Sequence, residues 1–491
     1  MKERIRKIKE NPVVAGIAVL LITVWTALRA SDTPLSVGKM GKDSAVYRYI
    51  AKVILKGGMP YRDSFDHKGP LVYLLDALGM TINESVGIWI IELISALATL
   101  FIAYKLARLV GCSRLAAVVS TLACAFSISY YLQGGNLVEE YACPFIMLSL
   151  YIFVKYFQEK TVKCHELLLC GASCAAVCLL RVNMVALWAV MCIGVILSCI
   201  REKKAGLLGR YIAWFVAGFA VVAAPVLIWL ASGNAVSAFI DDYFWFNLKY
   251  SSDAERASFA NVFNSTVSFA MGLPFVLCAV IFVHYAIEKR RLVDRLTVIT
   301  LVVSLLSMGM SGQESGHYGL ILCPLIGYAA ALLFGEVCSG ERGKVLQFET
   351  ANKTRKIRLV TLKACALVIL LFAVCRNRPT VMSELGNGLE EIAAVIQANS
   401  TKDEKIAACG NRDCIYLESD RMSFSVYSYQ DPIAEIDSAI KKEYLEGIRN
   451  LEPAIIVTTD SNILWRQMKQ TVEENYTLLE TINGTKIYRR K

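Results

Sequence analysis

Charged residues are scarce in this sequence. Only 19% of its 491 residues are Asp, Glu, Lys or Arg, whereas an ordinary soluble domain has roughly 25%. Histidine is rarer still, with four residues. No Cys and His residues have the spacing of a zinc site, and most of the 16 cysteines lie within apolar segments. These shortages exclude a disordered chain and a secreted disulfide scaffold.

Apolar residues are abundant, at 55% of the chain, and they form long segments between short basic clusters. This distribution excludes a soluble globular enzyme. The net charge of +10 does not indicate a nucleic-acid partner, because the basic residues form no single domain with interleaved aromatic residues. The sequence therefore predicts a polytopic α-helical membrane protein surrounded by lipid.

Eleven apolar stretches approach the roughly 20 residues that a helix needs to cross a bilayer core. The first follows a basic tail and lacks a small-residue cleavage site, so we interpret it as a retained helix. The fifth and sixth are short, and Arg181–Asn183 can form a tight turn between them. The predicted spans are 12–30, 86–107, 114–132, 141–158, 166–181, 184–200, 210–232, 266–286, 296–311, 318–336 and 359–375.

Lys and Arg residues set the predicted orientation, because they concentrate in cytoplasmic loops. The amino-terminal tail and every second loop are basic, whereas loops 133–140 and 312–317 contain no Lys or Arg. We therefore expect a cytoplasmic amino terminus, an outer loop at 31–85 and an outer segment at 233–265. The predicted domains are a transmembrane domain over 1–375 and an extracytoplasmic domain over 376–491.

The carboxy-terminal domain has the pattern of an α/β fold. Leu389–Ala398 is predicted to be helical, and the end of the chain is predicted to form a hairpin around Asn483-Gly484. The predicted strands are Lys405–Ala408, Cys414–Leu417, Ala454–Thr458, Tyr476–Leu479 and Lys486–Tyr488.

The first outer loop is the most informative stretch. Its apolar residues from Tyr47 to Leu55 recur at helical spacing on one face, which favours a helix lying on the membrane surface. Carboxylates, an imidazole and an ammonium group then gather in a Gly- and Pro-punctuated turn from Gly57 to Leu71. A carboxylate there can act as general base on an acceptor hydroxyl, and a Lys or Arg can hold a leaving phosphate.

These residues resemble the integral-membrane glycosyltransferases of the GT-C class, and most closely the bacterial branch related to protein O-mannosyltransferases and to the lipid A aminoarabinose transferase. The specific part of the likeness is Asp43 and the run Gly58-x-Pro60-Tyr61-x-Asp63-x-Phe65-Asp66-His67-Lys68-Gly69-Pro70-Leu71. Shorter matching pieces are Asn136-x-x-Glu139-Glu140, Arg181-x-Asn183, and His317-Tyr318 with Pro324. The predicted topology matches as well.

The resemblance implies that Asp43 is the catalytic carboxylate and that Lys68 contacts the lipid phosphate. It also implies a second acidic position, for which Glu139 and Glu140 both qualify. Adjacent helical residues point about 100° apart, so we favour Glu139. The further candidate substrate-binding residues are Tyr61, Asp66, His67, Arg181, Asn183, His317 and Tyr318.

Each candidate also has a structural interpretation. Asp43 can cap the surface helix, and Lys68 can face lipid headgroups. Glu139 or Glu140 can be a solvated helix start, and Arg181 can extend to the membrane interface. His317 can be a structural histidine whose hydrogen bonds are satisfied, and Asp63 and Asp66 can brace the turn. Asp241-Asp242 can be a solvated helix end rather than a metal-binding pair, and Glu92 can form a polar bridge.

The sequence thus predicts a glycosyltransferase of a bacterial cell membrane. Its expected donor is a sugar on polyprenyl phosphate, and its acceptor is an envelope polymer, lipid or protein. The alternatives are a transporter or lipid-linked-sugar flippase, and a non-enzymatic assembly protein. No cofactor is expected, since no cluster demands a divalent metal. Cys409 and Cys414 can either pair or remain free thiols.

Overall fold

The computed structural model describes residues 10–30, 33, 40–84, 86–252, 258–310, 312, 315–338 and 388–491. The predicted span at 359–375 and the predicted domain boundary at 375/376 lie outside these residues. The chain forms two compact units. The first comprises 1–35, 89–225 and 255–380, and the second comprises 36–88, 226–254 and 381–491.

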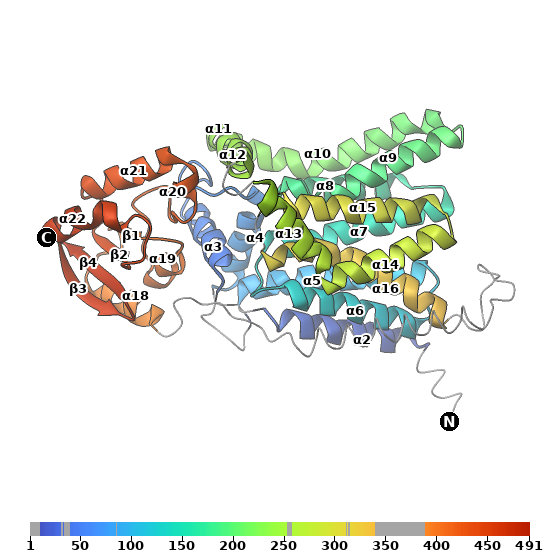
Figure 1. Cartoon of the computed structure of the whole chain (residues 1–491), viewed down its shortest axis with the longest axis horizontal. Coiled ribbons are helices and arrows are strands. Elements are labelled where there is room, and N and C mark those ends of the chain that lie inside the picture. Colours follow the sequence, from blue (N-terminus) through green and yellow to red (C-terminus); the bar gives the residue numbers. More distant parts are fainter. Residues whose placement is uncertain are drawn as a thin grey trace, which may run out of the picture. The chain divides into compact units, whose positions relative to one another are not determined.

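The first unit is helical, and most of its long helices run side by side (Figure 1). Apolar residues in these segments far exceed the number needed for one buried face, which is typical of membrane-spanning helices. The helices lying wholly or mostly in this unit are α2 (Pro12–Ala27), α5 (Gly87–Leu109), α6 (Arg114–Tyr131), α7 (Val138–Glu159), α8 (Cys164–Cys178), α9 (Ala186–Arg201), α10 (Leu208–Ser232), α13 (Phe259–Met271), α14 (Leu273–Glu288), α15 (Leu292–Gly309) and α16 (Cys323–Cys338).

Among the described residues, six helices are long and apolar enough to cross a membrane, or seven if one bent pair is a single span. Four further apolar helices are shorter, and they include the predicted first, fifth and sixth spans. The protein is therefore a multi-pass membrane protein, while the predicted total of eleven spans stays a prediction. The expected turn between the fifth and sixth spans is confirmed, because a short 3-10 helix, η1, occupies Val182–Met184.

The predicted span at 266–286 is bent rather than continuous. Helices α13 and α14 meet at an angle of 73°. Gly272 between them is extended, with ψ of 129°, and Pro274 lies in the first turn of α14. Proline lacks the N–H that a continuous helix would need there, so the helix breaks and restarts.

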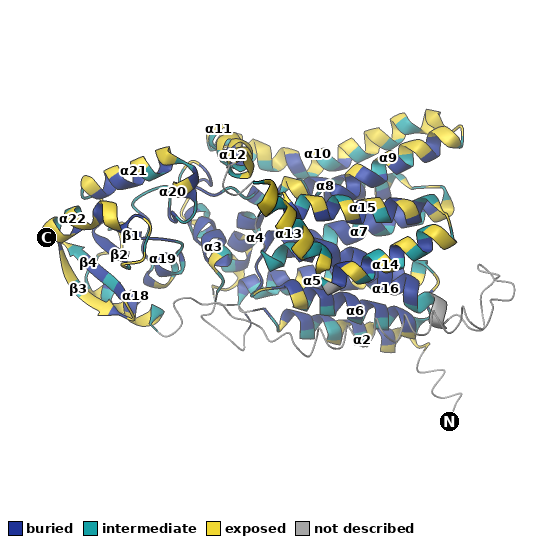
Figure 2. Ribbon diagram, in the orientation of Figure 1, coloured by how far each residue is buried: buried dark blue, intermediate teal, exposed yellow. Residues whose placement is uncertain are grey.

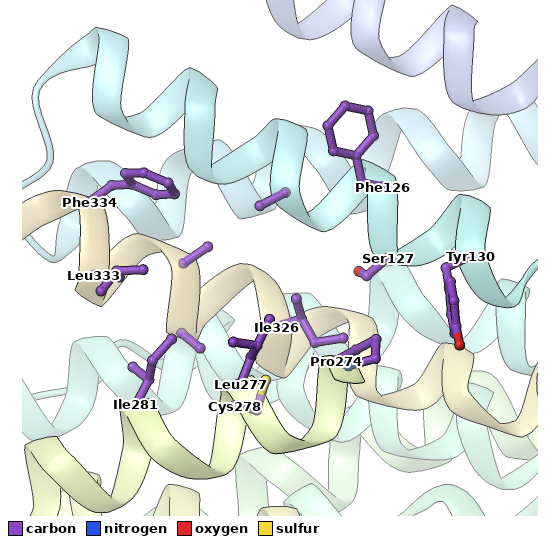
Figure 3. Close-up of a pocket in the computed structure, with 13 residues that line it drawn as sticks. Phe126, Ser127, Tyr130, Pro274, Leu277, Cys278, Ile281, Ile326, Leu333 and Phe334 are labelled. Carbon is purple, nitrogen blue, oxygen red and sulfur yellow. The ribbon is translucent and has the colours of Figure 1, made fainter. Parts of the chain in front are cut away.

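A small cavity lies between α6, α14 and α16 of the first unit. Its volume is about 40 Å³. Figure 3 shows Phe126, Ile281 and Phe334 among the side chains around it, with the Ser127 hydroxyl at one wall. The Ser127 hydroxyl donates to the carbonyl of Cys124, at 2.7 Å. This space is an apolar packing gap between helices.

The second unit combines residues 36–88 and 226–254 with the carboxy-terminal region. Its sheet has the order β1-β2-β4-β3, with β1 parallel to β2 and the other pairs antiparallel. The strands are β1 (Ile406–Ala408), β2 (Ile455–Thr458), β3 (Tyr476–Ile482) and β4 (Thr485–Arg490). The helices are α3 (Lys42–Leu55), α4 (Pro70–Ile82), α11 (Val236–Ile240), η3 (Asp241–Trp245), α12 (Phe246–Ser252), α18 (Leu389–Ala398), α19 (Cys414–Ser419), α20 (Ile433–Ile436), α21 (Ser438–Arg449) and α22 (Trp465–Asn475).

The α/β prediction for the carboxy-terminal region is confirmed in most elements. The helix at Leu389–Ala398 and the hairpin around Asn483-Gly484 are present, and residues 406–408 and 455–458 are strands. The predicted strand Cys414–Leu417 is wrong, because this segment is the helix α19. Four consecutive apolar residues are too few to show whether their pattern repeats as in a helix or as in a strand. Here the packing of a helix in the core decided the conformation against the strand propensity of these residues.

Helix α3 does not rest on a membrane surface as its apolar face predicted. Nine of its fourteen residues are buried. The Tyr49 ring packs on Tyr416 at 5.0 Å, and the Tyr49 hydroxyl accepts the N–H of Ser423 at 3.0 Å. Lys52 pairs with Asp420 at 2.8 Å. The carboxy-terminal region therefore covers the side of α3 that carries Tyr49 and Lys52. Of the face that the sequence assigned to lipid, Tyr47, Ile50 and Ala51 are also buried within the protein.

Candidate functional site

A buried ion pair in the first unit joins two of the predicted site residues. Arg181 Nη1 donates to Glu139 Oε1 at 2.7 Å, and only 3% of the Glu139 side chain is exposed. Glu139 lies in the first turn of α7, and Arg181 precedes the 3-10 turn after α8. Of the two candidate carboxylates, Glu139 is the one that meets the arginine, and its role in a reaction stays a prediction.

Further predicted residues surround this pair. The guanidinium of Arg181 lies over the ring of Tyr318, 4.5 Å from its centroid, in a cation–π contact. Glu139, Arg181, Asn183 and Tyr318 together line a small hollow, which we call the arginine pocket. The Asn183 carbonyl accepts a hydrogen bond from Ser307 of α15. The residues at this location come from α7, the turn at Arg181–Asn183, α15 and the short 3-10 helix that contains Tyr318, and together they fix the position of the cation.

The loop before α7 has an unusual backbone. Gln133, Gly134, Gly135 and Asn136 all have positive φ, from 42° to 105°. Such conformations cost free energy for residues other than glycine, so the surroundings must hold them. The Gln133 side-chain oxygen accepts the N–H of His317 at 3.1 Å, and the His317 ring nitrogen Nδ1 lies 3.0 Å from the same oxygen.

Glu92 of α5 braces this loop from within the helical unit. Only 1% of Glu92 is exposed, and its Oε1 accepts the Asn136 N–H at 2.5 Å. The Asn136 side-chain oxygen in turn accepts the Tyr141 hydroxyl at 2.8 Å. The structure therefore favours the bridging alternative for Glu92. Glu140 is also buried, and its carbonyl accepts the Ser95 hydroxyl at 3.4 Å.

In the second unit, the turn between α3 and α4 gathers the other candidates, and we call residues 57–70 the lysine turn. The Tyr61 hydroxyl donates to the Lys68 carbonyl at 2.7 Å. Tyr61 itself has a φ of 69° and is buried against Tyr73 and Phe239. Asp63 accepts from Arg62 and from the Met59 N–H, so it braces the turn.

Asp66 lies at the centre of the lysine turn and is 3% exposed. It accepts the hydroxyls of Tyr73 and Tyr429 at 2.7 and 2.8 Å. Burial by itself raises the pKa of a carboxyl, but the charges of His67 and Lys68 and the two hydroxyl donors outweigh it and hold the pKa of Asp66 below its usual value. Asp66 is therefore an ionised carboxylate buried within the lysine turn, and its partner Tyr73 also contacts the Lys68 carbonyl.

The side chains of His67 and Lys68 are in contact. Lys68 Nζ lies 2.5 Å from His67 Nε2, and an ammonium donates in such a contact. The imidazole stacks on Phe246 at 5.6 Å, and the His67 carbonyl accepts from Asn247 at 2.7 Å. The helix α12 thus fixes the direction in which Lys68 extends. The sequence did not indicate this role of α12, because it predicted only an outer segment over residues 233–265.

Asp242 differs from the solvated helix end that we expected at Asp241-Asp242. Burial, together with the negative charges of Asp66 and Asp241, raises the pKa of Asp242 to about 8. A carboxyl of this kind is protonated at neutral pH and can donate a hydrogen bond. No group of three His, Cys, Asp or Glu side chains suited to a metal is present among the described residues.

Asp43 is half-buried in the first turn of α3. The N-cap of that helix is Gly41, so Asp43 does not occupy the capping position that its structural interpretation required. Cys409 and Cys414 carry free thiols, and Cys409 lies 3.6 Å from the Tyr444 hydroxyl. Most of the predicted site residues therefore lie either in the arginine pocket of the first unit or in the lysine turn of the second, while Asp43 lies at the start of α3.

Two comparisons place the protein among known folds and families. ArnT from Cupriavidus metallidurans has a similar crystal structure in its apo state, with a TM-score of 0.62, 12% sequence identity and 97% of both chains covered. The structure of the same protein bound to undecaprenyl phosphate gives a TM-score of 0.61 and 13% identity, also over 97% of both chains. The fold implied by the resemblance to GT-C glycosyltransferases is thereby confirmed.

The sequence profile described as the putative competence-induced protein Ccs4 N-terminal domain matches residues 5–372. The chain belongs to this family. The match covers the helical unit and the first outer loop, and so includes the arginine pocket and the lysine turn. No functionally curated protein matches the chain.

Proposed function

We propose that this Ccs4-family protein transfers a sugar from a polyprenyl-phosphate donor to a hydroxyl acceptor at the outer face of a bacterial cell membrane. The observation that carries the proposal is the full-length likeness to a fold whose solved representative binds undecaprenyl phosphate. The acceptor is an envelope polymer, a lipid or a protein.

The proposed reaction is a displacement at the anomeric carbon. The acceptor oxygen forms a bond to that carbon while the bond from carbon to the phosphate oxygen breaks, and the electron pair leaves with the lipid phosphate. Asp43 takes the proton of the acceptor hydroxyl as general base. Because the leaving group is already a stabilised anion, the mechanism that we propose uses neither a strong general acid nor a divalent metal.

Each unit offers one fixed cation as a candidate for holding the phosphate. Lys68 is held by contacts of its carbonyl and its ammonium group, and Arg181 is held by Glu139 and Tyr318. Side chains fixed in this way lose little further conformational entropy when a phosphate binds, which favours tight recognition. In this proposal Glu139 orients Arg181. A direct catalytic role for Glu139 or Glu140 stays a prediction.

The test is transfer by the purified full-length protein in lipid discs, with undecaprenyl-phosphate sugars as donors and extracted envelope material as acceptor. Asp43→Asn should fold but lose transfer, while Asp403→Asn, at an exposed position, should keep it. Lys68→Ala should weaken binding of undecaprenyl phosphate by roughly tenfold or more, as expected for loss of one charge-assisted contact, and Lys442→Ala should not.

Transfer at normal rates by Asp43→Asn would contradict the role of that carboxylate. Movement of the lipid-linked sugar across the bilayer without transfer would instead support the flippase alternative. Mass spectrometry of envelope glycans from a deletion strain identifies the sugar that is missing. Chelator treatment tests whether transfer depends on a divalent metal, and we expect the transfer rate to stay unchanged.

A further inference from the structure

A second cavity in the helical unit is large and apolar. It has a volume of about 220 Å³ and lies between α7, α8, α9 and α10. Apolar cavities of about 150 Å³ stay dry and accept apolar guests, so this volume is suited to hydrocarbon rather than water. Side chains around it include Phe153, Tyr156, Leu167, Cys170, Ile196 and Phe215.

The cavity is distinct from the arginine pocket. Both involve α7, but Glu139 lies in the first turn of that helix and Tyr156 lies near its end. Seventeen residues separate them, which corresponds to about 25 Å along a helix. The cavity therefore belongs to the opposite end of the helical unit.

Close packing of α8 and α10 makes the cavity a defined space rather than a loose gap. A Cβ atom at Gly171 would overlap the Phe215 carbonyl, and one at Gly218 would overlap the Leu168 carbonyl. The absence of side chains lets the two backbones approach directly, as small residues do between membrane helices. Leu167, Cys170 and Phe215 then line the cavity beside this crossing.

The adjoining loops are strongly basic. Residues 155–166 and 198–210 contain seven Lys and Arg against three Glu. Lys155 pairs with Glu166, and Lys160 and Lys204 pair with Glu202. Within the described part of the chain, the remaining four cations have no carboxylate at ion-pair distance, and all four are exposed: Lys163, Arg201, Lys203 and Arg210.

Two of these cations are close sequence neighbours of residues that line the cavity. Val162 and Leu208 line it, and Lys163 and Arg210 follow them closely in the sequence. Arg210 Nη2 lies 3.0 Å from Cys164 Sγ, which links the start of α8 to the start of α10. A hydrocarbon-sized cavity with unneutralised cations at its rim matches an acyl chain joined to an anionic phosphate headgroup.

We propose that this cavity binds one acyl chain of an anionic phospholipid, whose headgroup phosphate contacts Lys163 and Arg210. The bound lipid fills the space between α8, α9 and α10 and stabilises their packing. Only 11% of the span that contains α10 is buried within the protein, compared with 72% for α7, so α10 makes little contact with the other helices. Its largely exposed surface is visible in Figure 2.

The experiment measures lipid retained by the full-length protein, using native mass spectrometry after exchange into detergent with phosphatidylglycerol or phosphatidylcholine. Wild-type protein should retain about one phosphatidylglycerol per chain and unfold at a higher temperature with it than with phosphatidylcholine. Ile196→Trp should fill the cavity. Each methylene lost from an apolar site weakens binding about fourfold, so retention should fall by more than about tenfold.

Ile193→Trp is the matched control, since Ile193 is an exposed residue of α9 outside the cavity lining. The double change Lys163→Gln and Arg210→Gln provides a second measure if the tryptophan variant fails to fold. It should abolish the preference for phosphatidylglycerol, whereas Arg290→Gln in another basic loop should preserve it.

Equal retention of the two lipids by the wild type would overturn the proposal, as would undiminished retention in Ile196→Trp. Displacement of phosphatidylglycerol by undecaprenyl phosphate would assign the cavity to the donor lipid instead. A photoreactive residue at position 195 that crosslinks to another part of the chain would show that protein, rather than lipid, fills it. Each result is independent of whether sugar transfer is observed.

Discussion

Arg181 and Glu139 form a buried ion pair, with Nη1 and Oε1 2.7 Å apart. Removing one partner of such a pair leaves an uncompensated charge in apolar surroundings. We expect Arg181→Ala to lower the free energy of unfolding by about 3–5 kcal/mol and to reduce transfer strongly. Thermal unfolding and transfer assays check both effects.

The exposed pair of Lys204 and Glu202 offers the control for this change. Lys204→Ala should cost less than about 1 kcal/mol, because solvent already stabilises both charges. If Arg181→Ala is as stable and active as Lys204→Ala, the pair has neither a structural nor a functional role.

Glu92 is expected to position the loop before α7 through its bond to Asn136. Glu92→Gln keeps an oxygen that accepts the Asn136 N–H, so this variant should retain most stability and transfer. Glu92→Leu leaves that N–H unsatisfied, at a cost of about 1–3 kcal/mol. Hydrogen exchange of the peptide covering residues 130–140 should rise in the leucine variant only, and unchanged exchange there would refute the positioning role.

Gly135 makes the same loop sensitive to one methyl group. Its φ is 87°, and a Cβ atom would overlap Glu92 Oε1. Gly135→Ala therefore combines backbone strain with a steric clash and should cost roughly 2–5 kcal/mol.

Gly111 separates these two contributions, because its φ is 96° but no atom lies within 4 Å of its Cβ position. Gly111→Ala should show only the strain, about 1–2 kcal/mol. Denaturation of the two variants in the same detergent makes the comparison, and equal losses would mean that Glu92 moves aside freely.

Asp413 gives the protein a pH-dependent stability. Burial raises its pKa to about 7, with a contribution from the charge of Asp66 and opposition from Ser428. The folded state then holds a proton that the unfolded state releases near pH 4. Stability from this group is fully present below about pH 4 and is lost as the pH rises to about 7.

Replacement by a group that does not titrate should remove this dependence. Asp413→Asn should flatten the decline in unfolding temperature between pH 4 and pH 7, while Asp403→Asn at an exposed site should leave it unchanged. Identical pH profiles for wild type and Asp413→Asn would contradict the linkage.

Local patterns predicted many elements of the chain correctly. Long apolar segments appear as helices, the break at Arg181–Asn183 is a turn, and Asn483-Gly484 closes a hairpin. These elements depend on residues that are close in the sequence. The helices follow from the length and spacing of apolar residues, and the hairpin follows from a backbone conformation that Asn and Gly adopt readily. The same patterns misassigned Cys414–Leu417, because four apolar residues suit a helix and a strand equally.

Apolar length and the distribution of Lys and Arg are local properties of the chain, and they were enough to predict a multi-pass membrane protein. The resemblance of the run after Gly57 to GT-C enzymes implied the rest of the arrangement. The partners of the polar residues could be read only from the folded structure. Glu139 meets Arg181 across 42 positions, Glu92 meets Asn136 across 44, and Asp66 meets Tyr429 across 363. Such contacts follow from the packing of whole helices and domains, for which no local pattern exists.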